Sequence, residues 1–421
     1  MDSNTLENII AGMAKQARNA SRKLASLPAS VKNKVLLKTA DALLEQENFI
    51  TAENKKDLAA GREKGLSAAM LDRLELSGKV IQSMVLGLRE VAALTDPVGE
   101  IESMKRRPSG ILVGRMRVPL GVVGMIYESR PNVTIDAAAL CLKAGNAVIL
   151  RGGSEAIHSN LALAKVLRDV LLAENVDPAV VQVIPVTDRQ AVNFMLAQEE
   201  YIDVIIPRGG EGLIRFVAET SRIPVLKHYK GVCHAYIDHD ADTDAGIRIV
   251  MNGKTQRPGV CNALEGMLVH RDIAATFLPK ASEALITAGV ELRGCPVSCT
   301  IVPEMTPASA EDWGTEFLDM IMVVKVVDDM DEAIRYIDEY GSRHTEVIVT
   351  NSYHNGQRFL REVDASAVMV NASSRFNDGG QFGLGAEIGI STTKLHAYGP
   401  MGLEELTTRK FIVYGEGETR L

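Results

Sequence analysis

The sequence has no apolar run long enough to cross a membrane. Its longest apolar stretches, such as Val118 to Tyr127, are far shorter than the ~20 residues that span a bilayer. The N-terminus carries Asp2 and Glu7 and has no continuous apolar segment of the kind found in secretion signals. These absences predict a cytoplasmic protein without a membrane partner.

Cysteine is scarce as well. The five cysteines are Cys141, Cys233, Cys261, Cys295 and Cys299. An odd number spread along a long chain argues against a framework of disulfides and fits a reducing compartment. Cys295 and Cys299 are the one close pair, and no second cluster of cysteine or histidine with ligand spacing accompanies them. We therefore expect no metal site. The two cysteines flank a proline, and we expect them to pack in a strand or loop.

The chain also lacks an excess of positive charge. It has 46 lysines and arginines against 54 aspartates and glutamates, a formal net charge of −8. This balance argues against a general role in binding nucleic acid, although a local basic pocket is compatible with it. Hydrophobic residues make up 46% of the 421 residues, enough for the cores of two or three domains of ~100–200 residues each.

What the sequence does contain is an ordered series of helix and strand patterns. Apolar residues recur at helical spacing over roughly residues 3–95, and residues 111–118 alternate like a β-strand between two prolines. From residue 122 onward, short apolar strands alternate with helices. The expected strands are residues 122–127, 147–150, 181–184, 204–206, 235–237, 266–269, 322–327, 346–350 and 367–370, followed by a tail strand at 410–414. Such alternation is typical of parallel sheets covered on both faces, here in two α/β units that meet near residues 222–232.

Cys261 is the candidate nucleophile. It follows Pro258 and Gly259, which force a turn. A cysteine leaving a turn can point at a cleft, where nearby N–H dipoles favour the thiolate, and Arg257 would add to this effect. The alternative is a small buried hydrophobic residue, the commoner environment of a free cysteine. The residues alone leave the two interpretations evenly balanced.

Asn132 follows the first strand of the expected parallel sheet, after Ser129-Arg130-Pro131. Its amide is able to donate a hydrogen bond to a developing oxyanion. Asparagine caps helices equally well, and taken alone the position favours the cap.

Two glycine turns join strands to helices, Arg151 to Glu155 and Pro207 to Gly212. Free N–H groups and the helix dipole at such turns attract phosphate, and an arginine stands beside each glycine pair. Neither turn matches the G-x-G-x-x-G fingerprint of dinucleotide-binding folds, so a plain tight turn is the alternative.

The eight histidines form no triad or metal set along the chain, and packing or surface placement is the simpler explanation for His228 and for His344. A third glycine-rich stretch, Arg375 to Gly389, is too rich in glycine for a core element. It is either a loop beside the active site or a mobile surface loop.

The order of these features, more than any one of them, carries a resemblance. In chain order they are Pro131-Asn132, Lys143 to Asn146, Ser154-Glu155, Pro207 to Gly210, Asp240 to Asp242, Cys261, Glu316-Phe317, Val370-Asn371 and Phe382-Gly383. On these motifs nearly the whole chain resembles the aldehyde dehydrogenase superfamily. The strings at residues 127–133, 207–210, 257–262 and 341–346 are similar to a branch of that superfamily that acts on glutamyl phosphate.

The resemblance implies the fold: an α/β architecture with two parallel-sheet, Rossmann-like domains and a β arm that serves oligomerisation. Residues 1–100 and 120–228 would form the cofactor-binding domain, and residues 229–390 the catalytic domain with Cys261. Residues 101–119 and 391–421 would form the oligomerisation arm and the C-terminal tail. In the arm, the strand near residues 111–118 would combine with the strand near residues 410–414.

The resemblance also implies the reaction. NADPH would reduce L-glutamyl 5-phosphate to L-glutamate 5-semialdehyde and phosphate through a thioester on Cys261, with Asn132 at the oxyanion, as the second step of proline biosynthesis. The residues implied for cofactor binding are Arg151, Ser154, Glu155, Arg208, Gly209, Gly210 and Glu316. The candidates for binding the substrate are Glu128, Arg130, Arg257 and His228. The residues alone do not separate NADPH from NADH, since Glu155 would repel a 2′-phosphate and Arg151 would attract one.

The chain departs from the superfamily pattern at one informative place. Hydrolytic members carry a glutamate general base at the domain junction, but residues 226–232 contain no acid, and His228 falls about where the glutamate would be. A carboxylate that activated water would hydrolyse the thioester that phosphate must attack in the reverse reaction. Basic Lys227, His228 and Lys230 instead suit an anionic leaving group.

Two kinds of alternative function are open. The chain could be another aldehyde dehydrogenase that acylates phosphate or coenzyme A, or a catalytically inactive scaffold that binds a kinase. Intact Cys261, Asn132 and Glu316 argue against the inactive scaffold. The resemblance further implies assembly into a homodimer or homotetramer and an association with glutamate 5-kinase.

Overall fold

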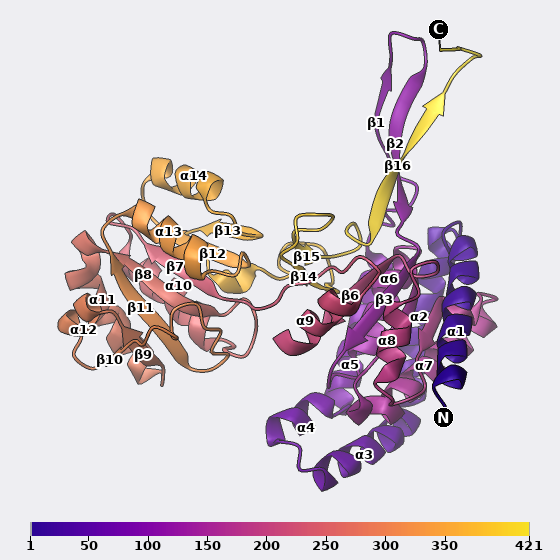
Figure 1. Ribbon diagram of the computed structural model, residues 1–421, viewed down its shortest axis with the longest axis horizontal. Helices are drawn as coiled ribbons and strands as arrows, with labels where there is room; N and C mark the ends of the chain where they lie inside the picture. Colours follow the sequence, from indigo (N-terminus) through magenta and orange to yellow (C-terminus); the bar gives the residue numbers. More distant parts are fainter. Residues whose placement is uncertain (1, 421) are drawn as a thin grey trace. The chain divides into compact units, whose positions relative to one another are not determined.

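Two compact units make up the chain, of which the computed structural model describes residues 2–420. Unit 1 contains the chain up to Lys227, Gly383–Gly389 and the chain from Met401 onward, and unit 2 contains His228–Phe382 and Ile390–Pro400. The break after Lys227 lies within the junction expected near residues 222–232. Residues Gly383–Gly389 pack with unit 1, although the sequence grouped them with the second series. Each unit is built on a parallel sheet of its own (Figure 1).

The sheet of unit 1 has the strand order β5-β4-β3-β6, with all neighbours parallel. Its strands are β3 (Val122–Tyr127), β4 (Ala147–Arg151), β5 (Val181–Val183) and β6 (Val204–Arg208). Every residue of β3 and β4 is buried, as expected for strands covered on both faces. The strand order reverses between β3 and β6. Open α/β sheets bind ligands at the carboxyl ends of strands where such a reversal occurs.

Helices cover this sheet on both faces. They are α1 (Ser3–Leu24), α2 (Ala29–Glu45), α3 (Glu47–Glu63), α4 (Ala68–Leu74), α5 (Gly78–Ala93), α6 (Val133–Lys143), α7 (Ile157–Ala173), α8 (Gln190–Leu196) and α9 (Glu211–Thr220), with short 3₁₀ turns η1 (Ser154–Ala156) and η2 (Pro178–Val180). Ile10 of α1 and Met195 of α8 share a buried core with Ile149 of the sheet. At Gly124 in β3 an added Cβ would lie 2.5 Å from Met195 Cε, so glycine here lets α8 approach the strand. The crossover helices α6 and α7 cover the opposite face.

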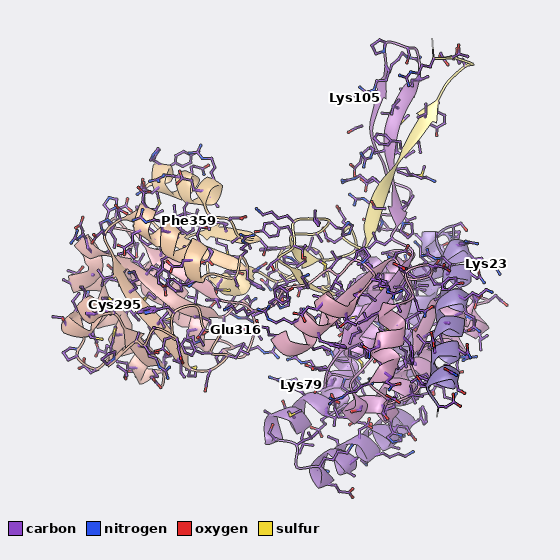
Figure 2. The ribbon with its side chains drawn as sticks, viewed as in Figure 1. Lys23, Lys79, Lys105, Cys295, Glu316 and Phe359 are labelled. Atoms are coloured by element: carbon purple, nitrogen blue, oxygen red, sulfur yellow. The ribbon has the colours of Figure 1, made fainter. Side chains whose placement is uncertain are left out.

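A three-stranded antiparallel arm projects from unit 1 (Figure 1; Lys105 of β1 is labelled in Figure 2). Its strands, in spatial order, are β1 (Ile101–Arg106), β2 (Leu112–Pro119) and β16 (Thr407–Tyr414). The pairing of β2 with β16 joins the two strands expected near residues 111–118 and 410–414. Arg117 is buried at the base of the arm, and its guanidinium lies 3.1 Å from the Glu102 carboxylate and 3.0 Å from that of Glu404. These ion pairs tie the two ends of the arm sequence together.

The sheet of unit 2 has the order β10-β9-β11-β8-β7-β12-β13 and is parallel throughout. Its strands are β7 (Cys233–Ile237), β8 (Leu264–His270), β9 (Glu291–Gly294), β10 (Thr306–Pro307), β11 (Ile321–Val327), β12 (Thr345–Val349) and β13 (Ala367–Val370). β7 and β12 are buried along their whole length. A separate pair of short strands, β14 (Gly389–Ser391) and β15 (Gly399–Met401), lies where the chain passes between the units.

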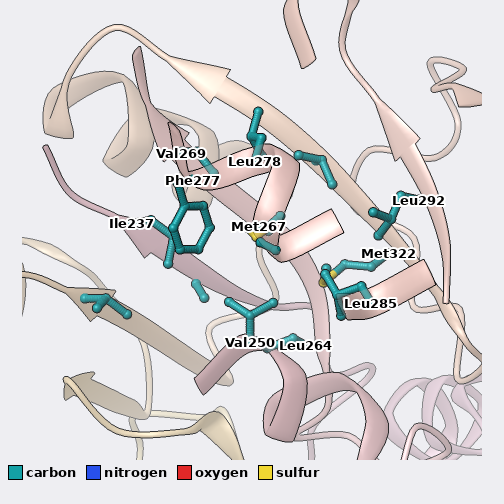
Figure 3. Packing of buried hydrophobic residues seen from close by; sticks show 14 of the residues in the cluster. Ile237, Val250, Leu264, Met267, Val269, Phe277, Leu278, Leu285, Leu292 and Met322 are labelled. Carbon is teal, nitrogen blue, oxygen red and sulfur yellow. The ribbon is translucent and has the colours of Figure 1, made fainter. Parts of the chain in front are cut away.

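The helices of unit 2 divide between the two faces of its sheet. They are α10 (Thr243–Thr255), α11 (Arg271–Thr287), α12 (Pro296–Ile301), α13 (Met330–Tyr340) and α14 (Tyr353–Glu362), with a 3₁₀ turn η3 (Ser374–Phe376). Figure 3 shows the core on one face, where Val250 of α10 and Phe277 of α11 pack with Met267 of β8. On the other face, Ile337 of α13 and Phe359 of α14 enclose a second core.

Several local expectations differ from the structure. Cys295 and Cys299 were expected in a strand or loop, but Cys295 caps α12 and Cys299 lies within it. The cause is local, because the Cys295 sulfur accepts a hydrogen bond from the Ser298 N–H at 3.5 Å. The strands β1 and β9 had not been predicted from their patterns. Within residues 2–420, no helix is both long and apolar enough to cross a membrane.

Candidate active site

Cys261 lies in the loop between α10 and β8 of unit 2. The loop is held from both sides: Ser374 Oγ donates to the Asn262 carbonyl at 2.7 Å, and Asn262 Nδ2 donates to the Asn377 carbonyl at 2.9 Å. At Gly231 an added Cβ would lie 1.9 Å from the Cys261 carbonyl oxygen, so glycine permits the two backbone segments to touch. The Cys261 side chain is partly exposed, which is the placement a nucleophile requires and not that of a core cysteine.

Two histidines converge on Cys261. One ligand-capable atom from each of His228, Cys261 and His344 lies within 4.8 Å of the others, although the three residues come from well-separated segments. The imidazole rings of His228 and His344 meet edge to face with centroids 5.6 Å apart. His228 Nδ1 lies 2.9 Å from the Ile390 carbonyl, which accepts only, so Nδ1 carries a proton. In the neutral ring Nε2 is therefore the nitrogen that accepts a proton.

His344 is fully buried and is positioned by its neighbours at the start of β12. Its Nδ1 lies 2.8 Å from Thr345 Oγ1, which also accepts a hydrogen bond from Asn377 Nδ2 at 2.8 Å. The Cys233 Sγ approaches the same ring nitrogen and lies 3.7 Å from His344 Nδ1. Burial raises the pKa of the Cys233 thiol well above its usual range, so Cys233 stays protonated and donates to the Cys261 carbonyl at 3.2 Å. The sequence had favoured packing or surface placement for His344.

Two arginines stand near Cys261, the candidate nucleophile. Arg375 Nε donates to Gln256 Oε1 at 2.7 Å, which holds the guanidinium beside the turn that carries Arg257. Burial lowers the pKa of Arg375, the positive charge of Arg257 lowers it further, and the nearby Cys261 opposes both effects. Like charges placed together beside a nucleophile favour an anionic ligand between them. Arg257 was a sequence candidate, whereas Arg375 had been noted only as part of a glycine-rich loop.

Glu316 lies in unit 2, in the segment before β11 (Figure 2). Its Oε1 accepts from the Gly231 N–H at 2.8 Å, and Lys230 Nζ donates to the Gly314 carbonyl at 2.8 Å. These bonds fix Glu316 to the segment of His228, so the structure groups Glu316 with Cys261, His228 and Arg257.

Asn132 lies in unit 1, in the turn from β3 to α6. It stands at the N-cap position of α6 with helical backbone angles and makes no capping hydrogen bond with its side chain. Its Nδ2 instead donates to Asp136 Oδ2 at 2.9 Å. Burial raises the pKa of Asp136 to about 6, and the hydrogen bond from Asn132 opposes the rise. The amide nitrogen carries two hydrogens, so one remains to serve an oxyanion.

The turns after β3 and β6 are joined at the point where the strand order reverses. Glu128 Oε2 accepts from the Gly210 N–H at 3.0 Å, and an added Cβ on Gly209 would lie 2.4 Å from the same oxygen. Arg208 ends β6 and packs its guanidinium against Gly389. Glu128, a candidate for binding the substrate, thus lies among the proposed cofactor residues of unit 1. Arg130 is half-buried in the same β3–α6 turn.

The turn after β4 is hydrogen-bonded to the turn after β3. Glu155 Oε1 accepts from the Ser129 N–H at 2.8 Å and from Ser129 Oγ at 2.9 Å. Arg151 is buried and donates to the carbonyls of Gly152 and Thr187, so its guanidinium supports the turn from within. Ser154 is exposed at the start of η1.

These turns fit a dinucleotide. Gly210 and Ser154 are exposed, α9 begins beside Gly210 without a side-chain cap, and an unsatisfied helix N-terminus attracts phosphate. Glu128 partly offsets this attraction because its carboxylate already occupies the Gly210 N–H. The structure therefore gathers the sequence candidates into two groups, one at the carboxyl ends of the unit 1 strands and one around Cys261 in unit 2.

Comparisons with known proteins identify the family and the fold. The aldehyde dehydrogenase family model matches residues 4–298. The chain is 61% identical over 416 residues to the gamma-glutamyl phosphate reductase of Desulfatibacillum aliphaticivorans, covering 99% of this chain and 100% of that protein. It is 62% identical over 416 residues, with the same coverage, to that of Desulfotalea psychrophila. A crystal structure of gamma-glutamyl phosphate reductase from Thermotoga maritima matches with a TM-score of 0.96 and 46% identity, covering 98% of this chain and 100% of that chain.

Proposed function

The chain belongs to the aldehyde dehydrogenase family, and we propose that it reduces L-glutamyl 5-phosphate to L-glutamate 5-semialdehyde and phosphate with NADPH, as the second step of proline biosynthesis. It is an oxidoreductase of the aldehyde dehydrogenase type. The observation that carries the proposal is a partly exposed Cys261 beside two histidines and two arginines. Relatives that share this chain nearly end to end bear the name of that reductase.

Cys261 begins the reaction as a nucleophile. His228 Nε2 takes the thiol proton, because the Ile390 carbonyl keeps the other ring nitrogen protonated. The sulfur then bonds to the acyl carbon of the substrate. The carbon–oxygen bond to phosphate breaks with its electron pair on the phosphate, which leaves a thioester on Cys261.

The oxyanion at the acyl carbon needs hydrogen-bond donors. We assign this role to the Asn132 amide and the Cys261 backbone N–H. Asp136 holds one hydrogen of the Asn132 amide, which orients the other. Because Asn132 belongs to unit 1 and Cys261 to unit 2, this step requires both units.

The anionic substrate and the departing phosphate need cations. Arg257 and Arg375 meet this need near Cys261, and protonated His228 returns its proton to the leaving phosphate. We also retain Arg130 and Glu128 as candidates for the carboxylate and ammonium of the glutamyl group. The absence of an acid from residues 226–232 protects the thioester from hydrolysis.

The proposed cofactor residues are Arg151, Ser154, Glu155, Arg208, Gly209 and Gly210 in unit 1 and Glu316 in unit 2. The chemistry supplied by bound NADPH is a hydride for the acyl carbonyl carbon. Ser154 and the N–H groups at the start of α9 would hold the phosphates. Glu316, fixed by the Gly231 N–H, would orient the nicotinamide ribose. After reduction the carbon–sulfur bond breaks and Cys261 leaves as the thiolate.

The wider assignments follow from the same proposal. Cofactor binding belongs to residues 1–100 and 120–228, catalysis to residues 229–390, and oligomerisation to the arm and tail at residues 101–119 and 391–421. We propose a cytoplasmic homodimer or homotetramer. Hand-over of a labile acyl phosphate would favour association with glutamate 5-kinase.

The test uses purified protein in both directions. NADPH oxidation is followed with glutamyl phosphate generated in place, and NADP reduction with glutamate semialdehyde is followed with and without phosphate. We expect the second reaction to require phosphate. If coenzyme A replaces phosphate, or if phosphate has no effect, the proposed substrate is wrong.

A Cys261→Ala variant supplies the control for the covalent step. It should abolish turnover in both directions while NADPH binding, measured by fluorescence titration, is retained. Turnover at the wild-type rate in this variant would contradict the thioester.

A further inference from the structure

His228, Cys261 and His344 together resemble the ligand set of a metal ion. We propose that these three side chains bind a thiophilic divalent cation, represented by Zn²⁺, and that the bound ion reversibly blocks the nucleophile. One thiolate and two imidazoles are preferred zinc ligands, and three protein ligands leave one coordination position open. Their ligand atoms already lie within 4.8 Å of one another. The sequence predicted no metal site, because these three residues are far apart along the chain.

The hydrogen bonds around the histidines are those of metal-binding imidazoles. A histidine that ligates a metal through one nitrogen usually donates its other N–H to an oxygen, which fixes the ring. His228 Nδ1 does so to the Ile390 carbonyl at 2.9 Å. His344 Nδ1 lies 2.8 Å from Thr345 Oγ1, whose two lone pairs are able to accept from both His344 and Asn377. The supporting groups are thus in place before any ion arrives.

The charges and ligand atoms around Cys261 favour Zn²⁺ and Co²⁺ over Mg²⁺ and Ca²⁺. Arg257 and Arg375 near Cys261 oppose any dication, so binding has to come from bonds to sulfur and nitrogen. Mg²⁺ and Ca²⁺ prefer oxygen ligands and would gain little here. Solvent reaches the site, because Cys261 and His228 are partly exposed while His344 is buried. We therefore expect Zn²⁺ and Co²⁺ to bind and Mg²⁺ not to bind.

Binding of the ion exchanges the thiol proton for a sulfur–metal bond and changes no oxidation state. The thiol proton passes to solvent as the sulfur–metal bond forms. The ion and the acyl group exclude each other, because both require the same sulfur. Inhibition of the reaction by the bound ion rests on the proposed function, but binding of the ion to the three side chains does not.

The test is Co²⁺ titration of the whole protein, followed by absorption spectroscopy. A thiolate-to-cobalt charge-transfer band should appear with wild-type protein and be absent in Cys261→Ala. Thr345→Val, which removes the group that supports His344, should weaken binding by about 10- to 100-fold. His344→Ala removes a ligand and should weaken binding further. A matched control is His239→Ala, because His239 belongs to a second cluster with Asp238 and Asp240 that offers no sulfur. This variant should leave the band unchanged.

A second measurement needs no variant. Zn²⁺ should slow the alkylation of Cys261 by iodoacetamide, mapped by mass spectrometry, while Cys295 reacts as before and Mg²⁺ has no effect. The proposal is overturned if wild type gives no charge-transfer band, if the band persists in Cys261→Ala, or if Zn²⁺ leaves Cys261 alkylation unchanged. Neither measurement uses substrate. A chain that binds cobalt but does not reduce glutamyl phosphate would therefore refute the proposed function alone.

Discussion

The sequence allows two roles for Asn132, a helix cap or a hydrogen-bond donor to an oxyanion, and the hydrogen bonds of the structure distinguish them. The residues alone favoured a helix cap, and Asn132 does occupy the N-cap position of α6, but its side chain makes no capping bond and instead donates to Asp136 at 2.9 Å. We expect Asn132→Ala to lower kcat by roughly 10²–10³ with little change in melting temperature, since an oxyanion donor acts in the transition state. Steady-state kinetics and calorimetry measure the two effects. A lower melting temperature with unchanged kcat would restore the cap.

The ionisation of buried Asp136 should make the stability of the protein depend on pH. Burial raises its pKa from the usual 3.8 to about 6, so the folded chain holds this proton more tightly than the unfolded chain. Ionised Asp136 therefore lowers stability, an effect absent below pH 3.8 and complete above about pH 6. We expect Asp136→Asn to melt higher than wild type at pH 8, with the difference vanishing near pH 4.

Measurements of kcat distinguish the positioning of Asn132 by Asp136 from the effect of Asp136 on stability. Asparagine at position 136 still offers an oxygen to Asn132, so Asp136→Asn should keep most of kcat. Asp136→Leu offers none, and misorientation of Asn132 should cost on the order of 10- to 100-fold in kcat. If Asp136→Leu turns over like wild type, Asp136 does not position Asn132.

At the scale of elements, local pattern predicted most of the strands. β3 and β13 match the expected residues 122–127 and 367–370 because each is a short apolar run between turn signals. β1 was not predicted, since half of its residues are charged, most are exposed, and it forms only by pairing with β2. The convergence of His228 and His344 on Cys261 depends on β7, β8 and β12 lying close together in one sheet, which no local signal specifies.

A buried ion pair connects α10 and β8, the two elements on either side of the Cys261 loop. Lys254 of α10 lies 2.7 Å from Glu265 of β8, and both are buried; Glu265 also accepts from the Leu318 N–H at 3.2 Å. Lys254→Met leaves a buried carboxylate without its cation, and we expect a loss of about 3–5 kcal/mol in the free energy of unfolding. Urea titration measures it. Since burial raises the pKa of Glu265, the loss should be larger at pH 8 than at pH 5.

The double variant tests whether the charge is responsible. Replacing Lys254 by Met together with Glu265 by Leu removes both charges and should recover most of the stability. A double variant as unstable as Lys254→Met would assign the effect to packing instead.

At the scale of the whole molecule, the chain divides its proposed chemistry between two sheets. The proposed dinucleotide residues other than Glu316 follow the strands of unit 1, whereas the proposed nucleophile Cys261 and its two histidines lie at the amino ends of strands in unit 2. The sequence indicated two parallel α/β series, but it did not indicate that residues 383–389 return to unit 1. That return depends on contacts such as Gly389 with Arg208, which are distant in sequence.

The arm supports a prediction about assembly. β16 is an edge strand, paired with β2 alone among the described residues, and it exposes Phe411 and Val413 to solvent at 68% and 56%. An exposed apolar edge strand is a template for pairing with another chain, so we expect this strand to join subunits. Glutamate at both positions should reduce the mass measured by light scattering while leaving the circular dichroism unchanged. Leu172→Glu on α7, where the replaced side chain is 53% exposed, is the matched control and should keep the wild-type mass. An unchanged mass in the double variant would show that subunits meet elsewhere.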